Sequence, residues 1–234
     1  MVASTSRGTC KKKSWIELDE ERNYVVHLEA TSVTRLLLAR HGQTELSRSD
    51  TFCGVSEPAL TALGREQARR LAERLSHERI DTLYCSLQGR ALETAKPIAA
   101  ALGLPIQTRE ALHEMDFGLW EGRIQAEVAE ESPAMMAAWD RGSWMIQPPG
   151  GEMQQAVLAR LVPCVVELLS AHAGQTLLLV GHRTAFRLLV GHLLNLSLPN
   201  SRGLHVDPAS LSKLLVVGDQ VQLVFYNDTS HLSA

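Results

Sequence analysis

Short apolar runs that alternate with amphipathic stretches restrict this chain to one class of fold. The runs at residues 33–39 and 176–180 are nearly continuous in Leu and Val, which is typical of strands buried on both faces of a sheet. Further strands are expected at residues 80–85, 104–107, 211–217 and 221–226. Because strands that alternate with helices form a mostly parallel sheet covered on both faces, we predict an α/β fold. The last two strands are close enough to form a hairpin, which predicts an antiparallel edge.

The amphipathic stretches between these strands predict the helices. Residues 61–78 carry apolar side chains at helical spacing, and Thr61 is a suitable N-cap. Residues 86–102 predict a second helix, with Ser86 as its N-cap and Pro97 as a kink or break. Further helices are expected at residues 125–130, 134–140, 152–171 and 184–194.

The composition is that of one globular domain with an extension at its N-terminus. The chain has 234 residues, of which 45% are hydrophobic and 21% charged, so it can bury a sizeable core without disulfides. We assign residues 33–234 to a single α/β domain and residues 1–32 to the extension. Residues 1–13 are small, polar and basic and are expected to be disordered, whereas residues 14–18 and 24–28 predict a short hairpin.

Charge and cysteine usage exclude several classes of function. A net charge of -3 and an aromatic content of 5% argue against a nucleic-acid partner. The four cysteines form no CxxC pair, so we expect neither a zinc ribbon nor a disulfide scaffold, but free thiols in the cytoplasm. No apolar run reaches the roughly 20 residues that a bilayer span requires, so we expect no membrane partner.

Basic and imidazole side chains follow three of the predicted strands. Arg40 and His41 follow the strand at residues 33–39, and His182 follows the strand at residues 176–180. Arg90 lies in the first turn of the helix after a third strand. Because ligands of an open α/β sheet bind beyond the carboxyl ends of its strands, we expect these groups to share one crevice.

A phosphoryl group is the ligand that best suits this set of side chains. Arginine forks bind pairs of anionic oxygens, and a neutral imidazole near pH 7 can attack phosphorus. Such a site needs no metal, because arginine and histidine supply the positive charge. A proton donor for the leaving oxygen is also required, and our candidate is Glu114, with Asp116 and Glu121 as alternatives.

Four sequence pieces carry a resemblance to a known family. They are Leu38-Ala39-Arg40-His41-Gly42-Gln43-Thr44; Ser86 with Arg90; Glu114 followed by Phe117-Gly118 and Trp120-Glu121-Gly122; and Val180-Gly181-His182. In this order they resemble the histidine phosphatase superfamily, also called phosphoglycerate-mutase-like, over residues 33–226. The resemblance implies a three-layer α/β sandwich and a reaction without a cofactor. It also implies that the domain at residues 33–234 is a histidine phosphatase domain.

The resemblance assigns a role to each matching residue. It makes His41 the phosphorylated nucleophile and Glu114 the proton donor and acceptor. It makes Arg40, Arg90 and His182 the phosphate pocket.

The chain departs from the family pattern around the expected pocket mouth. Ser47 stands where the family often has Asn, Cys53 precedes Gly54 where a polar residue is common, and Arg183 follows the second histidine where Gly is frequent. We therefore treat Ser47, Cys53, Gly54 and Arg183 as possible substrate-binding residues. Around Glu114 the sequence is similar to the phosphatase branches, in particular to alpha-ribazole and broad-specificity phosphatases.

The function that we predict is hydrolysis of a small phosphorylated metabolite through a phosphohistidine, without a metal. The alternatives are a phosphoglycerate-type mutase and a catalytically silent phosphate-binding or scaffold protein on the same fold. A homodimer is possible. Outside the expected site, we predict that Arg187 lies on a solvated helix face and that His205 is a surface or structural residue. We also expect the thiols Cys85 and Cys164 to lie in the core.

Overall fold

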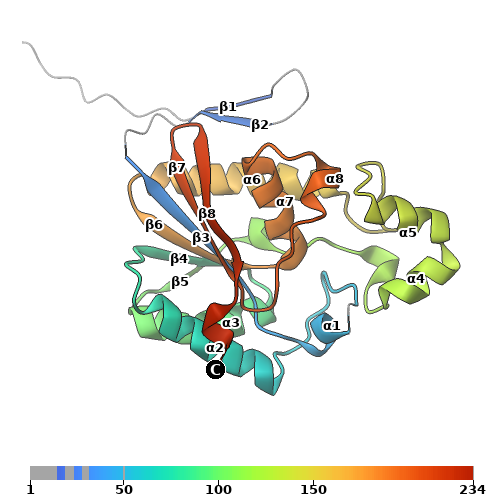
Figure 1. The fold of residues 1–234 in the computed structure, drawn as a ribbon, viewed down its shortest axis with the longest axis horizontal. Helices are drawn as coiled ribbons and strands as arrows, with labels where there is room; N and C mark the ends of the chain where they lie inside the picture. The colour runs from blue at the N-terminus through green and yellow to red at the C-terminus, as the bar shows by residue number, and fades with distance from the viewer. Residues whose placement is uncertain (1–14, 19–23, 28–31, 50, 234) are drawn as a thin grey trace, which may run out of the picture.

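The main sheet of the computed structural model has six strands in the order β5-β4-β6-β3-β7-β8 (Figure 1). The structure describes residues 15–18, 24–27, 32–49 and 51–233. The strands are β3 (Thr34–Arg40), β4 (Thr82–Cys85), β5 (Ile106–Thr108), β6 (Thr176–Gly181), β7 (Leu211–Val217) and β8 (Gln220–Asp228). The first four are parallel, whereas β7 runs antiparallel to β3 and β8 antiparallel to β7. A mostly parallel sheet with an antiparallel edge is confirmed.

A separate pair of short strands lies in the N-terminal segment. Strands β1 (Trp15–Leu18) and β2 (Tyr24–His27) pair antiparallel, with Trp15 opposite His27 and Leu18 opposite Tyr24. The expected disorder of residues 1–13 lies outside the described residues.

The two faces of the sheet carry different core clusters, because successive strand residues point to opposite faces. In β3, Leu36 and Leu38 belong to the cluster that contains α6 (Gln154–Ala171) and α7 (Arg183–Leu193). Leu37 belongs to the other cluster, with α2 (Ala62–Leu75) and α3 (Gly89–Leu102). Figure 1 shows the two helix pairs on opposite sides of the sheet. This alternation explains the continuous apolar runs and completes a three-layer sandwich.

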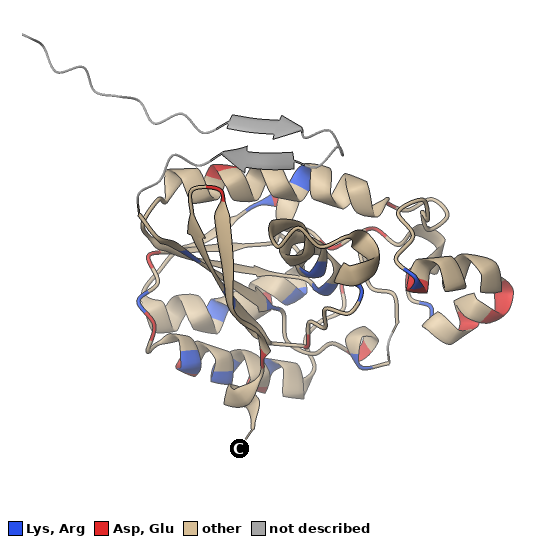
Figure 2. Cartoon of the chain, turned by 45° about the horizontal axis from the view of Figure 1, so that its top comes forward, with Lys and Arg blue, Asp and Glu red and all other residues tan. Residues whose placement is uncertain are grey.

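The remaining helices are short and lie outside the two main layers. They are α1 (Glu45–Arg48), α4 (Gln125–Glu131), α5 (Pro133–Asp140), α8 (Leu198–Ser201) and the 3-10 turns η1 (Glu110–Leu112), η2 (Gly118–Trp120) and η3 (Ser230–Leu232). Acidic residues gather on α4, and the arginines of α2 form ion pairs along its outer surface (Figure 2). Helix α6 is long and apolar enough by composition to cross a membrane, but its buried residues pack in the core as those of a core helix do.

Several local predictions are confirmed and one, the N-cap of the second predicted helix, is wrong. Thr61 caps α2 by accepting a hydrogen bond from the Gly64 backbone N–H at 2.9 Å. The N-cap of α3 is Gln88 and not Ser86, because the chain leaves β4 through two further residues before it turns. Pro97 lies inside α3 without ending it, since the helix is held against the sheet by fully buried residues on either side of the proline. Cys85 is buried in the core, as expected. Cys164 is partly buried and packs against the core cluster that contains α6 and α7.

A close approach between two glycines fixes the loop that follows β3. The backbone N–H of Thr61 donates to the Gln43 carbonyl at 2.9 Å, which brings the start of α2 against this loop. A Cβ on Gly64 would overlap that carbonyl, and a Cβ on Gly42 would overlap the carbonyl of Gly64. Because neither glycine has a side chain, the loop packs closely against the start of α2. This packing positions His41, the residue before the loop.

Candidate active site

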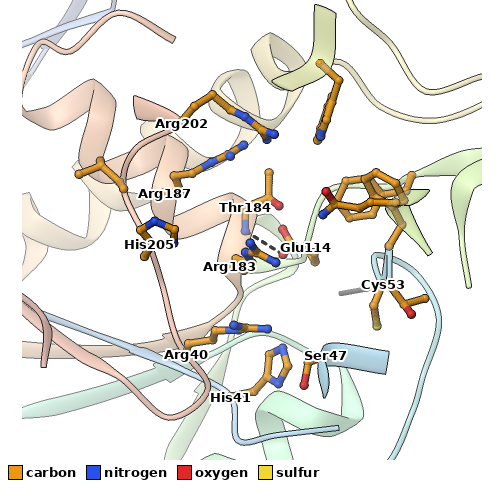
Figure 3. A pocket seen from close by; sticks show the side chains of 16 residues that line it. Arg40, His41, Ser47, Cys53, Glu114, Arg183, Thr184, Arg187, Arg202 and His205 are labelled. Atoms are coloured by element: carbon orange, nitrogen blue, oxygen red, sulfur yellow. Dashed lines mark hydrogen bonds between the residues drawn. The ribbon is translucent and has the colours of Figure 1, made fainter. Parts of the chain in front are cut away.

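A pocket of about 230 Å³ opens beyond the carboxyl end of the sheet (Figure 3). It is formed by the loops after β3 and β6, by the segment around Glu114 and by residues from α4, α5 and the chain after α8. The lining residues are Arg40, His41, Ser47, Thr51, Phe52, Cys53, Glu114, Phe117, Gln125, Trp139, Arg183, Thr184, Arg187, Arg202, Leu204 and His205. This is the edge at which ligands of parallel sheets bind.

His41 is held in one tautomer by its own loop. Its backbone N–H donates to the Gly181 carbonyl at 3.0 Å, which ties the end of β3 to the end of β6. Its Nδ1 lies 2.7 Å from the Gly42 carbonyl oxygen. A carbonyl only accepts, so Nδ1 carries the proton, and the lone pair of the neutral ring is on Nε2. The nitrogen that can attack an electrophile is therefore Nε2.

His182 lies beside His41 with neither ring nitrogen hydrogen-bonded. The two ring centroids are 5.3 Å apart and the rings are tilted by 54°. His182 is fully buried, and neither Nδ1 nor Nε2 has a partner among the described residues. Buried polar groups are nearly always paired, so this imidazole is suited to a ligand oxygen that completes its hydrogen bonding.

The electrostatics of the site favour uncharged imidazoles. Burial, together with the positive charges of Arg40 and Arg90, lowers the pKa of His41 well below its ordinary value. Burial and the charge of Arg90 do the same to the pKa of His182. Burial and Arg183 lower the pKa of Arg40 to about 10, which leaves its guanidinium charged at neutral pH. The site thus combines two neutral imidazoles with fixed positive charge, and of the two rings His41 lines the pocket whereas His182 lies buried beside it.

The two arginines expected to bind phosphate are placed differently. Arg40 lines the pocket and donates from Nη1 to the Val206 carbonyl at 2.6 Å, and in the part of the chain that the structure describes its Nε has no partner. Arg90 is fully buried and is not a lining residue. Its terminal nitrogens donate to the carbonyls of Ser56 at 2.6 Å and Gly54 at 2.8 Å, and only its Nε has no partner. Arg90 therefore holds the loop around Gly54 in place by hydrogen bonds. Its positive charge acts on the two histidines although it does not line the pocket.

Of the three carboxylates considered as proton donor, only Glu114 lines the pocket. Its Oε2 accepts from the Thr184 backbone N–H at 2.8 Å, and its Oε1 accepts from those of Ala185 at 3.0 Å and Met115 at 2.8 Å. Two of these donors belong to the first turn of α7. Glu121 is instead engaged by the backbone of the loop at Gly54, Val55 and Ser56. Asp116 accepts from the backbone of Gly118.

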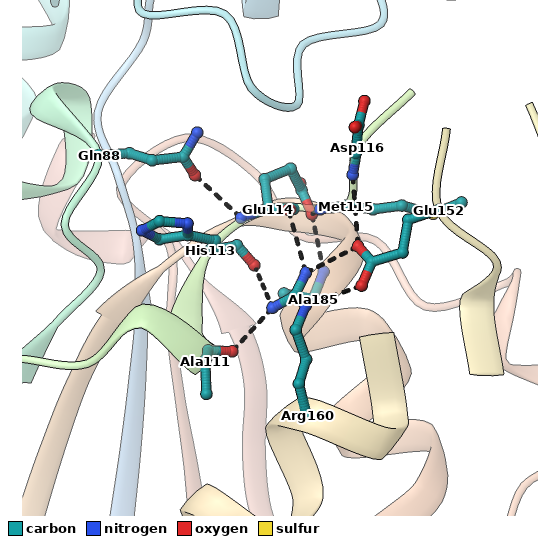
Figure 4. A network of polar contacts seen from close by, with 9 residues as sticks. All are labelled: Gln88, Ala111, His113, Glu114, Met115, Asp116, Glu152, Arg160 and Ala185. Carbon is teal, nitrogen blue, oxygen red and sulfur yellow. Dashed lines mark hydrogen bonds and ion pairs between the residues drawn. The ribbon is translucent and has the colours of Figure 1, made fainter. Parts of the chain in front are cut away.

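A second layer of hydrogen bonds holds the segment around Glu114 (Figure 4). Arg160, from α6, donates to the carbonyls of Ala111, His113 and Glu114 and is paired with Glu152 at 2.8 Å. Gln88 accepts from the Glu114 backbone N–H at 2.9 Å and donates to the Gly54 carbonyl at 2.6 Å. This irregular segment is thus fixed against both α6 and the end of β4.

Three of the four possible substrate-binding residues line the pocket, namely Ser47, Cys53 and Arg183. Ser47 also closes a capping box with Thr44 at the start of α1. Burial raises the pKa of the Cys53 thiol to about 11, so it stays protonated at neutral pH. Gly54 is not a lining residue, and its carbonyl is occupied by Gln88 and Arg90.

The structure corrects one assignment, adds His205 to the pocket lining and adds an arginine. Arg187 does not lie on a solvated face: its residue is only 7% exposed and it lines the pocket. The reason is that α7 presents its first turns to the pocket, so that residues four apart, Arg183 and Arg187, share one face. His205 is exposed at the surface, as expected, and also lines the pocket. Arg202 was not singled out by any motif, because it enters from the distant segment after α8.

Metal-ligating side chains are not clustered in the part of the chain that the structure describes. No group of three or more His, Cys, Asp or Glu side chains there is arranged to hold an ion. The positive charge of the pocket comes from guanidinium groups of Arg40, Arg183, Arg187 and Arg202.

The buried imidazoles predict how stability depends on pH. The unfolded chain protonates both rings near their ordinary pKa of 6.5, whereas the folded protein keeps His41 and His182 neutral. The unfolded state therefore binds more protons below this value, and the free energy of unfolding falls as the pH drops through it. Each ring therefore contributes separately to the loss of stability below neutral pH. Denaturant titrations of His41→Asn and His182→Asn are each expected to show a shallower pH dependence.

Replacement of an exposed histidine provides the control. His77→Asn is expected to leave the pH dependence of wild type unchanged, because His77 is exposed. If the free energy of unfolding of His41→Asn and of His182→Asn depended on pH as steeply as that of wild type, the neutral, buried state of the two rings would be contradicted.

The chain is similar to a known protein family and to several of its members. The model of the histidine phosphatase superfamily (branch 1) matches residues 36–229. A phosphoserine phosphatase of Hydrogenobacter thermophilus is 30% identical over 200 residues, which are 86% of this chain and 95% of that protein. A bifunctional protein of Mycobacterium tuberculosis is 36% identical over 201 residues, 85% of this chain and 55% of that protein. The chain thus spans about half the length of the mycobacterial relatives that it matches.

A solved structure, the YhfR protein of Bacillus stearothermophilus, superposes with a TM-score of 0.80 at 28% identity and covers 86% of this chain and 100% of that one. The family match includes every residue that lines the pocket, together with Arg90 and His182. The chain belongs to the histidine phosphatase superfamily, branch 1.

Proposed function

We propose that this protein hydrolyses phosphomonoesters of a small metabolite through a phosphorylated His41 and without a metal ion. The observation that carries the proposal is the state of His41: its Nδ1 hydrogen is bound by the Gly42 carbonyl, and its ring is kept neutral by burial and by two arginines. The name of the related phosphoserine phosphatase agrees with this activity. The small size of the pocket favours a small substrate.

The first step forms a bond between His41 Nε2 and phosphorus while the bond from phosphorus to the leaving oxygen breaks. The phosphoryl oxygens accept hydrogen bonds from Arg40, whose Nε has no partner among the described residues, and from the ring of His182, whose nitrogens have none there either. Arg90 does not line the pocket, but its positive charge acts on both histidines. These groups stabilise the negative charge of the transition state without reorganisation, because the fold already holds them in place.

Glu114 transfers the protons in both steps. Its Oε1 accepts two backbone hydrogen bonds and its Oε2 accepts one, so Oε2 has a lone pair left for a proton. In the first step the proton passes from Glu114 to the leaving oxygen. In the second step water attacks phosphorus and gives a proton to Glu114, and the electrons of the P–N bond return to His41 Nε2.

The proposal places the catalytic domain at residues 33–234, since every pocket residue lies between Arg40 and His205. Residues 1–32 are then the extension that precedes this domain. A cytoplasmic location agrees with the free thiols of Cys53, Cys85 and Cys164. The homodimer and the absence of nucleic-acid and membrane partners stay predictions.

Replacement of the nucleophile tests the covalent mechanism. His41→Asn is expected to lose at least about 10³-fold in turnover of p-nitrophenyl phosphate, because Asn offers no nucleophilic nitrogen. Wild-type turnover is expected to be unchanged by EDTA. Protection against thermal unfolding by inorganic phosphate should persist in the variant, since Arg40 and His182 are intact. Substantial turnover in His41→Asn, or loss of wild-type turnover in EDTA, would contradict the proposal.

Leaving-group chemistry tests the role of Glu114. An alkyl phosphate leaves as a basic alkoxide and needs a proton, whereas p-nitrophenolate leaves with little help. Glu114→Gln keeps the shape of the side chain and removes the proton, so it should slow glycerol phosphate more than p-nitrophenyl phosphate by about 10²–10⁴-fold.

The control is Glu121→Gln, which removes charge from a neighbouring carboxylate outside the pocket. Its effect on the two substrates is expected to be equal. Equal slowing of both substrates in Glu114→Gln, with selective slowing in Glu121→Gln, would move the acid to Glu121.

A further inference from the structure

The segment at residues 206–210 holds the backbone at the end of β3, where the nucleophile lies. The backbone N–H of Ala209 donates to the His41 carbonyl at 3.1 Å, and the backbone N–H of Arg40 donates to the Ser210 carbonyl at 3.2 Å. The placement of both site residues therefore depends on a segment that lies far from them in sequence.

The hydrogen bond from Ala209 fixes the peptide group that orients the His41 ring. The His41 carbonyl and the Gly42 N–H belong to this one planar group. Thr94 Oγ1 accepts from that N–H at 3.0 Å, so the group is held at both ends. The next carbonyl, that of Gly42, accepts the Nδ1 hydrogen of His41. The direction in which His41 Nε2 points therefore depends on how this peptide group is held.

Ala209 has a backbone conformation that residues with a side chain rarely adopt. Its φ is 56°, in the left-handed region, and the residue is completely buried. Such a conformation persists only where the surrounding structure holds it. The torsions of Ala209 connect the peptide group that donates to His41 with the peptide group that carries the Ala209 carbonyl. A donor on that carbonyl therefore helps to keep the Ala209 N–H directed at His41.

His231 provides this donor from the C-terminal turn η3, which lies beside α2 (Figure 1). Its Nε2 lies 3.0 Å from the Ala209 carbonyl oxygen. Because a carbonyl only accepts, Nε2 carries the hydrogen. Burial lowers the pKa of His231, which favours the neutral ring. Its Nδ1 is buried and has no hydrogen-bond partner among the described residues, so within them the ring is held through Ala209 alone.

We propose that His231 is a positioning residue for the nucleophile: through the Ala209 carbonyl it holds the peptide group of His41 in the orientation that attack on phosphorus requires. This inference rests on the proposed function and adds to it a residue that does not line the pocket. Displacement of a reacting group by about 1 Å can slow a reaction by about 10²-fold, so a contact outside the pocket can control the rate.

A second anchor keeps the segment attached when the bond from His231 is removed. The Asn227 side chain accepts from the Asp207 backbone N–H at 2.7 Å and donates to the Asp207 carboxylate at 2.7 Å. The neighbouring carbonyl of Val206 accepts from Arg40 Nη1. Loss of the His231 bond is therefore expected to loosen the chain at Ala209 while the Arg40 side chain stays in place.

Two replacements of His231 separate its hydrogen-bond donor from its volume. His231→Met fills similar space without a donor, whereas His231→Gln places an amide N–H near the position of Nε2. With the enzyme in excess over p-nitrophenyl phosphate, release of p-nitrophenolate measures how fast phospho-His41 forms. His231→Met is expected to slow this step by about 10- to 100-fold, and His231→Gln to remain within about threefold of wild type. The inhibition constant of inorganic phosphate should change by less than about threefold in both, because Arg40 and His182 are intact.

The matched control is Arg70→Met, which removes a different hydrogen bond from the same turn. Arg70 donates from Nη1 to the carbonyl of Leu232, the residue after His231, at 2.9 Å. This variant keeps the bond to Ala209 and is expected to form phospho-His41 at the wild-type rate. Equal slowing in Arg70→Met and His231→Met would overturn the proposal, since the docking of η3 would then be what matters. Equal slowing in His231→Met and His231→Gln would overturn the role of the donor.

Exchange of backbone amide hydrogens tests the contact without turnover. The Ala209 N–H binds the His41 carbonyl, whereas the His41 N–H binds the Gly181 carbonyl. His231→Met is expected to speed exchange at Ala209 by about tenfold or more relative to exchange at His41, whereas a loss of global stability speeds both alike. Equal acceleration at the two amides would contradict the role of His231. Failure of wild type to turn over p-nitrophenyl phosphate would overturn the phosphatase proposal instead, and the exchange rates would still decide whether His231 holds Ala209.

Discussion

The site depends on keeping two buried imidazoles uncharged beside permanent positive charge. His41 and His182 lie at the ends of adjacent parallel strands, and each loses the stabilisation that water gives to a charged ring. Arg40 and Arg90 add repulsion that a phosphate dianion relieves. The same arrangement therefore makes the nucleophile available and makes the empty pocket receptive to an anion. Neither property needs a bound metal, because the charge belongs to arginine side chains.

The rest of the structure holds this arrangement in place. Glu114 is fixed by the first backbone N–H groups of α7, the helix that also carries Arg183 and Arg187 into the pocket. Arg160 fixes the backbone of Glu114 against α6. Rigid helices thus position the proton donor and the cations, while irregular loops contribute the pocket walls. Precise placement of this kind is what electrostatic catalysis requires, since the charges must be in position before the reaction begins.

Strands and most helices of the domain could be predicted from the sequence, because the apolar periodicity of β3 and β6 follows directly from burial on both faces. The motif residues could be predicted as well, since strand ends converge at one edge of a parallel sheet. Arg202 could not be predicted, because it directly follows the four-residue helix α8 and belongs to none of the motifs. The hydrogen bonds from Arg90 to the carbonyls of Gly54 and Ser56 could not be predicted either, because they depend on how a loop distant in sequence folds back. The pocket position of Arg187 could have been predicted, because its spacing of four residues from Arg183 places both side chains on one face of a helix.

The stereochemical course at phosphorus tests the central claim most directly. A phosphorothioate monoester, made chiral at phosphorus with oxygen isotopes, would be hydrolysed in water that carries a third isotope. Attack by His41 and then by water inverts the configuration twice, so the account predicts inorganic thiophosphate with net retention. Direct attack by water inverts it once. Net inversion would contradict the phosphohistidine and, with it, the role assigned to the neutral imidazole of His41.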